Sequence, residues 1–171
     1  PLQMTRELDD AILLLRTNEP ELGLWVLKTR GDGAKVSAYD EALLANQDHW
    51  FVGEVIGMLR RTLSRLDVSS RSLYAVIEPG SAFAGTLAEL VLAADRGYML
   101  ELISDPDNGP VLHLSKANFG LYPMCNGLSR LQSRFLGHPA RIAELEDLIA
   151  GPIPSGEAHE REARRQQPPV G

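Results

Sequence analysis

The chain has 171 residues, of which 44% are hydrophobic, so its length and composition fit one domain with a real core. A formal net charge of −6 argues against nucleic-acid binding, and the single cysteine, Cys125, excludes an internal disulfide. The N-terminus PLQMTRELDD lacks a signal-peptide pattern, and no apolar run approaches the about 20 residues of a membrane span. These features predict a soluble cytoplasmic protein that binds neither nucleic acid nor a membrane.

The first half of the chain predicts two helices around a buried strand. Apolar residues recur at helical spacing over residues 2–16, which indicates a first helix. The compact apolar run LGLWVLKT (22–29) predicts a buried strand. The polar, glycine-containing stretch 30–40 predicts a loop, and the apolar pattern over 40–66 predicts one long helix.

A second buried strand, SLYAVIEP (72–79), leads into a Gly/Ser turn at 80–84. The remaining predicted elements are a helix at 85–94, strands at 98–102 and 111–115, a helix at 126–137 capped by Asn126, and a helix at 139–149. Strands that alternate with helices predict an α/β fold with a parallel sheet.

The composition changes near the C-terminus, where GPIPSGEAHEREARRQQPPVG is rich in Pro, Gly and charge. We therefore expect one domain over residues 1–153 and a disordered polar tail over 154–171. Two or three buried strands make a thin sheet for this many helices. A fragment, or one partner of an assembly, is the expectation that fits best.

The strand–turn–helix from Ile77 to Leu100 carries the most chemical information. Gly80 and Gly85 bracket the turn, and glycine there permits positive φ and close approach of a ligand to the backbone. The first amides of the following helix lack intrahelical partners and lie at the positive end of its dipole. Such amides can stabilise a thioester oxygen as it becomes an enolate.

Glu89 lies in this apolar helix, three residues after Thr86 and on the same helix face. Its apolar neighbours would desolvate the carboxyl and raise its pKa, as suits a general acid/base. The alternative is a buried ion pair, with Arg96 or Arg130 as the partner. Spacing alone leaves both open.

Several motifs carry a resemblance to a known family. GSAFAGTLAELVLAAD resembles the second oxyanion segment of the crotonase (enoyl-CoA hydratase/isomerase) superfamily, usually GxxxGGGxELAxxCD. FGLYPMCNGLSRL (119–131) resembles the later LGxxPGxGGTQRL segment, and MTRELDDAI (4–12) and LGLWVLKTRGDG (22–33) match the family's first helix and following strand. The resemblance covers about 4–150 and implies a crotonase-like ββα spiral core, incomplete at both ends.

The resemblance also implies site residues. Glu89 matches the first catalytic glutamate of the family, and Thr86 matches the glycine whose amide is an oxyanion donor. Gly85 and Ala38 are the implied substrate-binding positions, with Ala38 as the nearest match to the second oxyanion donor. Lys116 stands where the family has its second glutamate, so it would bind a CoA phosphate, pair with Glu89, or mark a divergent or inactive copy.

The segment SSRSLYAVIEPGSAFAGTLAEL is most similar to a ring-opening acyl-CoA lyase of that superfamily. An acyl-CoA thioester is then the implied ligand, CoA is part of the substrate, and no metal or other cofactor is implied. The full-length protein is expected to be a homo-oligomer. The alternatives are a generic enoyl-CoA hydratase or isomerase, and a non-catalytic acyl-CoA-binding chain or inactive fragment.

Other chemistry-bearing residues have structural interpretations. Asp48 and His49 are consecutive and point in different directions on a helix, so they do not form a triad. His113 is interpreted as a core histidine, and Cys125 as a core or turn residue without a base beside it. Arg60, Arg61 and Arg65 are expected on a solvated helix face, with contact to CoA phosphates as the alternative.

Overall fold

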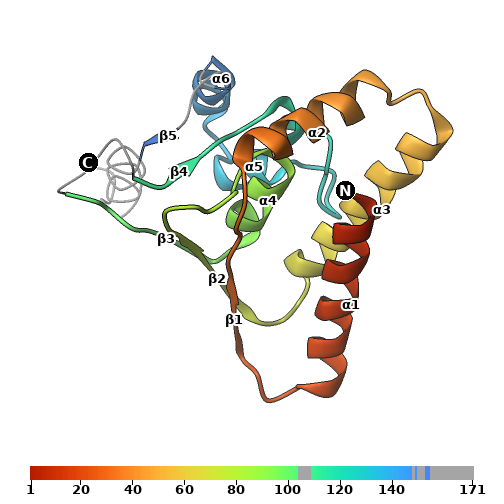
Figure 1. Cartoon of the computed structure of the whole chain (residues 1–171), viewed down its shortest axis with the longest axis vertical. Coiled ribbons are helices and arrows are strands. Elements are labelled where there is room, and N and C mark those ends of the chain that lie inside the picture. The colour runs from red at the N-terminus through yellow and green to blue at the C-terminus, as the bar shows by residue number, and fades with distance from the viewer. Residues whose placement is uncertain (104–108, 148, 150–152, 155–171) are drawn as a thin grey trace.

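The computed structural model describes residues 1–103, 109–147, 149 and the backbone of 153–154. It contains a parallel sheet of three strands in the order β1-β2-β3, with Leu24 opposite Ser72 and Tyr74 opposite Arg96 (Figure 1). The strands are β1 (Leu24–Leu27), β2 (Ser72–Ile77) and β3 (Arg96–Met99). The predicted α/β fold with a parallel sheet is confirmed.

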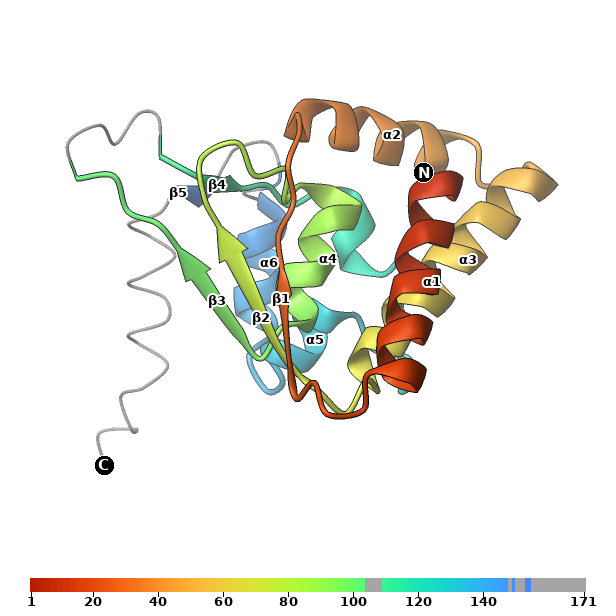
Figure 2. The same ribbon diagram turned by 60° about the horizontal axis from the view of Figure 1, so that its bottom comes forward.

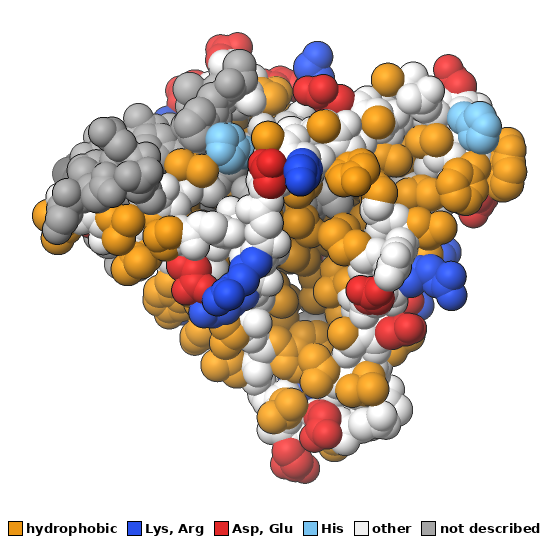
Figure 3. Space-filling model, viewed as in Figure 1, with side chains coloured by type: hydrophobic (Ala, Val, Ile, Leu, Met, Phe, Trp, Pro, Cys, Tyr) orange, Lys and Arg blue, Asp and Glu red, His pale blue; other side chains and the backbone are white. Residues whose placement is uncertain are grey.

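The sheet buries only one of its faces within the described part of the chain. Trp25 on β1 and Leu73, Ala75 and Ile77 on β2 point into the core. On the opposite face Leu24 and Val26 are 46% and 52% exposed, and Figure 3 shows hydrophobic side chains over the region of these strands. The strand predicted at 22–29 forms as β1, but it is buried on one face only, although parallel strands are usually covered on both faces.

Two long helices pack beside each other next to the sheet. They are α1 (Leu2–Asn18) and α3 (Trp50–Asp67), which lie side by side in both ribbon views (Figures 1 and 2). Ile12 of α1 and Leu59, Leu63 and Leu66 of α3 join the core. The helix predicted over 2–16 is confirmed. Among the described helices, none has both the length and the apolar character that crossing a membrane requires.

The region between β1 and β2 differs from the prediction of a loop and one long helix. Helix α2 (Gly33–Ala45) begins inside the predicted loop, because the Asp32 carboxylate accepts from the Ala34 amide and caps its first turn. A break follows at residues 46–49, and the Nδ1 atom of His49 accepts from the Phe51 amide to cap α3. Two local caps thus divide the apolar pattern into two helices.

The turn after β2 leads into α4 (Gly85–Ala93), as predicted. The strand predicted at 111–115 is shorter and lies outside the parallel sheet. It forms β4 (Val111–Leu112), which pairs antiparallel with β5 (Ile153–Pro154). The expected tail therefore begins within a described strand at Pro154, and residues 155–171 lie outside the described residues.

The C-terminal part begins with a 3₁₀ turn, η2 (Lys116–Phe119), followed by two short helices. These are α5 (Arg130–Arg134) and α6 (Pro139–Asp147). The helix predicted over 126–137 is thus shorter than expected, because Ser129 and not Asn126 caps it, in a reciprocal capping box with Gln132. Helices α4, α5 and α6 lie beside and behind the strands in Figure 2.

Candidate active site

The turn before α4 has the backbone conformation that its glycines predict. Gly80 and Gly85 have φ of +82° and +45°. A Cβ atom at Gly85 would lie 1.8 Å from Oδ2 of Asp40, so a side chain there is excluded by space as well as by φ. The Gly85 amide donates to the carbonyl of His113 at 3.0 Å, which commits it to the backbone rather than to a ligand.

The Thr86 amide, the implied oxyanion donor, holds an anionic oxygen of the chain itself. It donates to Oδ2 of Asp40 at 2.7 Å, and the Thr86 hydroxyl also bonds Asp40. The same hydroxyl lies 2.8 Å from the Tyr122 hydroxyl, and Ser115 donates to Oδ2 of Asp40 at 3.1 Å. Burial raises the pKa of Asp40, while the hydrogen bonds from Thr86 and Ser115 oppose that rise.

Sequence reasoning missed Asp40, which stands 46 residues before Thr86. It belongs to the stretch 37–40 in which the resemblance places the second oxyanion donor, but that match does not identify it as the partner of Thr86. In the structure it is 2% exposed on α2. A carboxylate thus occupies the position that a thioester oxygen would take to bind the Thr86 amide.

Glu89 is 2% exposed and has a partner on each carboxylate oxygen. Asn118 Nδ2 donates to Oε1 at 2.7 Å, and Arg130 Nη1 donates to Oε2 at 2.8 Å. Arg130 also binds both oxygens of Asp67, at 2.7 and 3.0 Å. The ion pair with Arg130, one of the two alternatives left by the sequence, is what the structure contains, and Arg96 lies exposed at the start of β3.

Burial raises the pKa of Glu89, in the direction expected from its apolar helix, and the charge of Arg130 opposes the rise. Lys116 does not pair with Glu89. It is exposed at the first position of η2, two residues before Asn118. The carboxylate is therefore held by an arginine and an amide, an arrangement that stabilises the packing of α3, α4 and α5 around one buried cation.

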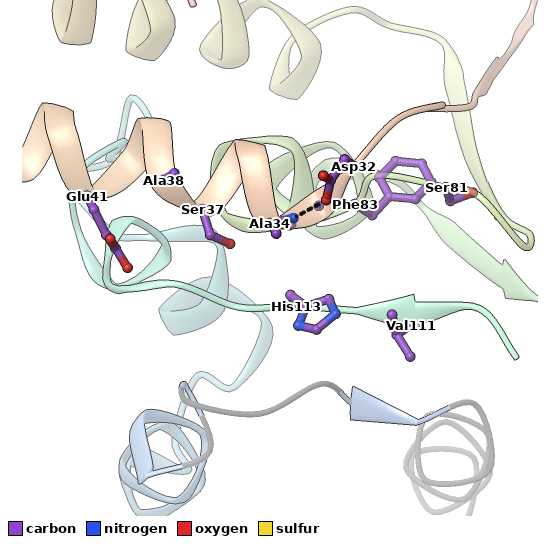
Figure 4. Close-up of a pocket in the computed structure, with 11 residues that line it drawn as sticks. Asp32, Ala34, Ser37, Ala38, Glu41, Ser81, Phe83, Val111 and His113 are labelled. Atoms are coloured by element: carbon purple, nitrogen blue, oxygen red, sulfur yellow. Dashed lines mark hydrogen bonds between the residues drawn. The ribbon is translucent and has the colours of Figure 1, made fainter. Parts of the chain in front are cut away.

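A cavity of about 510 Å³ lies between the first turns of α2, the turn after β2 and strand β4, and neither Thr86 nor Glu89 is among the residues that line it. Figure 4 shows Ser37 and Glu41 projecting from α2 toward the strand that carries His113 and Val111. His113 lines this cavity rather than the core, and burial lowers its pKa. Its imidazole is thus neutral and available as a hydrogen-bonding group at neutral pH.

Ala38 lines the same cavity, but it is the sixth residue of α2. Its amide lies beyond the first turn and is engaged within the helix, because only the first four amides of a helix lack intrahelical partners. The structure therefore places Ala38 at the wall of the cavity with its side chain and not as a free backbone donor. The first amides of α2 are engaged as well, because the Ala34 amide donates to the Asp32 carboxylate and the Lys35 and Val36 amides donate to the Asp32 carbonyl.

Of the predicted residues, Ala38 and His113 line the cavity, and the others lie outside its lining. His49 caps α3 and Asp48 precedes it, and Cys125 is exposed in the turn before α5. Over the described ranges, no group of three or more His, Cys, Asp or Glu side chains is arranged to hold a metal ion.

A parallel sheet whose second strand leads through a glycine turn into a helix with a buried glutamate is the arrangement that the resemblance to the crotonase superfamily implies. No protein-family model matches the chain. The chain is 59% identical, over 146 residues, to a benzoyl-CoA-dihydrodiol lyase of Aromatoleum evansii. The match covers 85% of this chain and 26% of that relative, so the chain spans about a quarter of the relative's length. This similarity confirms the resemblance found in the sequence motifs.

Proposed function

We propose that this chain is part of an acyl-CoA lyase that opens the ring of 2,3-epoxybenzoyl-CoA, formerly described as the dihydrodiol, in aerobic benzoate degradation. The observation that carries the proposal is the 59% identity to a benzoyl-CoA-dihydrodiol lyase over 85% of the chain. Ring opening by water yields formate and an aliphatic semialdehyde that stays joined to CoA. CoA is part of the substrate, and the proposal requires no metal or redox cofactor.

In this proposal the thioester lies in the cavity beside α2, whose first turn forms one wall. The positive end of the helix dipole there favours a carbonyl oxygen that gains negative charge. The Thr86 amide becomes a backbone donor to that oxygen when Asp40 withdraws from it. Burial assists that withdrawal, because it raises the pKa of Asp40, and a neutral carboxyl binds an amide less strongly than a carboxylate does.

Glu89 manages proton transfer to or from water in the same proposal. For this role it must release one of its two partners, Asn118 at 2.7 Å or Arg130 at 2.8 Å. The amide of Asn118 is the weaker partner, since it carries no charge. The Oε1 atom is therefore the one proposed to face the reacting water.

A second candidate function follows from the same contacts. Both Glu89 and the Thr86 amide are held by groups of the chain itself, which favours a chain that binds an acyl-CoA without reacting with it. Such a chain would keep the cavity that binds the acyl-CoA but would not catalyse ring opening. The two candidates differ in what replacement of Glu89 does.

The test incubates the chain with 2,3-epoxybenzoyl-CoA and measures formate, and in parallel with crotonyl-CoA and measures hydration. Equilibrium dialysis measures binding of benzoyl-CoA. Catalysis predicts formate release that falls about 10²–10⁴-fold in Glu89→Gln. The matched control is Glu144→Gln on α6, where the carboxylate is 58% exposed, and it should leave the rate unchanged. Binding without formate supports the second candidate, hydration of crotonyl-CoA alone supports a generic hydratase, and an absence of both binding and turnover contradicts all three.

A further inference from the structure

A second cavity, of about 570 Å³, lies between the middle of α3 and the turn before α5. It shares no lining residue with the cavity beside α2, in which the proposed function places the thioester. Gly57, Arg60, Arg61 and Ser64 line it from the helix, and Met124 and Cys125 line it from the turn. We call it the α3 pocket.

The two arginines of the α3 pocket are uncommitted cations. Arg60 and Arg61 are exposed, and neither takes part in an ion pair within the described ranges. Their neighbour Arg65, by contrast, is bound to Asp9 of α1. Guanidinium groups are planar donors that match the oxygens of a phosphate, and Ser64 adds a hydroxyl one turn further along the helix.

The floor of the α3 pocket is open because Gly57 has no side chain. A Cβ atom built at Gly57 would meet nothing within 4 Å. The opposite wall is an ordered turn, in which the Met124 amide donates to the Leu128 carbonyl at 2.8 Å and the Gly127 amide to the Met124 carbonyl at 2.9 Å. The pocket therefore combines a cationic side with an apolar wall and free space between them.

One opposing charge lies in the same pocket. Glu54 also lines it, but stands seven residues before Arg61, about 10 Å along the helix at 1.5 Å per residue. The carboxylate thus marks the far end of the pocket, away from the arginines. Glu54 repels an anion at Arg60 and Arg61 from this longer distance, so it weakens the binding of that anion only a little.

We propose that the α3 pocket binds a phosphorylated small molecule. Its phosphate lies between Arg60 and Arg61, with Ser64 as a further donor, and its less polar part lies over Gly57 and Met124. Two sources supply this chemistry, a free polyphosphate or the nucleotide part of CoA. Inorganic pyrophosphate and adenosine 3′,5′-bisphosphate are the probes that distinguish them.

Cys125 provides a reporter within the pocket, since it is exposed and is the one cysteine of the chain. The experiment measures the rate at which N-ethylmaleimide, a neutral reagent, labels Cys125 with and without each probe, at constant ionic strength set by sodium chloride. Pyrophosphate should slow the labelling, and the bisphosphate should do so more strongly if the nucleotide part of CoA is the natural ligand. Equal protection by both assigns the site to phosphate alone.

Variants of the pocket sharpen the test. Arg60→Gln combined with Arg61→Gln should raise the half-protecting concentration of pyrophosphate at least about tenfold. Arg16→Gln, an exposed arginine at the end of α1, should leave it unchanged. Glu54→Gln should lower it, because the opposing charge is removed.

Gly57→Leu should abolish protection by filling the pocket, whereas Gly57→Ala keeps most of the space. Both replace glycine inside a helix with a better helix former where no atom obstructs, so their melting temperatures should equal or exceed that of the original chain. No protection by either probe at millimolar concentration overturns the proposal. So does protection that the double arginine variant retains in full.

Discussion

Replacing Arg130 with methionine removes the cation that two buried carboxylates share. Nη1 of Arg130 lies 2.8 Å from Oε2 of Glu89, and Nη2 lies 2.7 Å from Oδ2 of Asp67. The three side chains are 1%, 2% and 8% exposed, so water cannot replace the lost partner. Removal of one member of a buried ion pair typically costs about 3–5 kcal/mol of unfolding free energy.

The cost of protonating Glu89 gives a second, independent value for this loss of unfolding free energy. Once Arg130 is gone, the chain can neutralise Glu89 by binding a proton. At pH 7, starting from the ordinary pKa of 4.5, protonation costs about 3.4 kcal/mol at about 1.36 kcal/mol per pH unit. The two values agree, so we expect Arg130→Met to lose about 3–4 kcal/mol at pH 7.

The same reasoning gives the pH dependence. Burial raises the pKa of Glu89 and of Asp67 in the folded chain, and loss of Arg130 removes the charge that opposes the rise. A carboxyl whose folded pKa is raised stabilises the fold most in acid and loses that contribution as pH rises through the folded pKa. The deficit of Arg130→Met relative to the original chain should therefore shrink by more than half between pH 7 and pH 4.5.

Urea denaturation at both pH values, followed by far-ultraviolet circular dichroism, measures this deficit. The control is Arg141→Met, which breaks an ion pair whose partners are 39% and 58% exposed and should change stability by less than about 0.5 kcal/mol. A loss below about 1 kcal/mol for Arg130→Met at pH 7 would refute the reasoning, because the pair would then behave as an exposed one. A deficit that stays constant in acid would show that burial of the carboxylates is not its cause.

Two further predictions concern the turn and the caps. Gly85→Ala should lower the free energy of unfolding by more than about 3 kcal/mol in urea denaturation, because its Cβ atom meets Asp40. Gly80→Ala has free space around it and should lower that free energy by only about 1–2 kcal/mol. Equal losses would contradict the steric argument. Ser129→Ala should lower stability by about 1 kcal/mol through loss of the α5 cap, and Asn126→Ala by less than about 0.5 kcal/mol; thermal unfolding compares them, and the reverse order would restore Asn126 as the cap.

Sequence reasoning was most accurate where one element contains its own signals. The apolar strand, the glycine turn and the helix with Glu89 follow each other within residues 72–94, and the structure reproduces all three. It was least accurate where a cap competed with an apolar pattern. Asp32 caps the start of α2 inside the predicted loop, and His49 caps the start of α3 inside the predicted long helix. The capping box of Ser129 and Gln132 was present in the sequence and was the signal that could have placed α5.

The candidate site shows the same division. Burial of Glu89 and the rise of its pKa followed from its apolar neighbours, but the choice between Arg96 and Arg130 did not. The contacts of Asp40 could not be predicted either, because its partners Thr86 and Ser115 are 46 and 75 residues away.

The sequence by itself determined the α/β order of elements, the glycine turn that ends at Gly85 and the presence of a buried carboxylate on α4. Only the tertiary structure decided what that carboxylate and the Thr86 amide contact. Local patterns act over a few residues, through hydrogen bonds within one turn and through the period of the apolar side chains. The contacts of Glu89 with Arg130 and of Thr86 with Asp40 join residues 41 and 46 positions apart, and they form only when the helices pack together. The strand–turn–helix can thus be predicted from the local sequence, whereas tertiary packing decides which groups its hydrogen-bond donors contact.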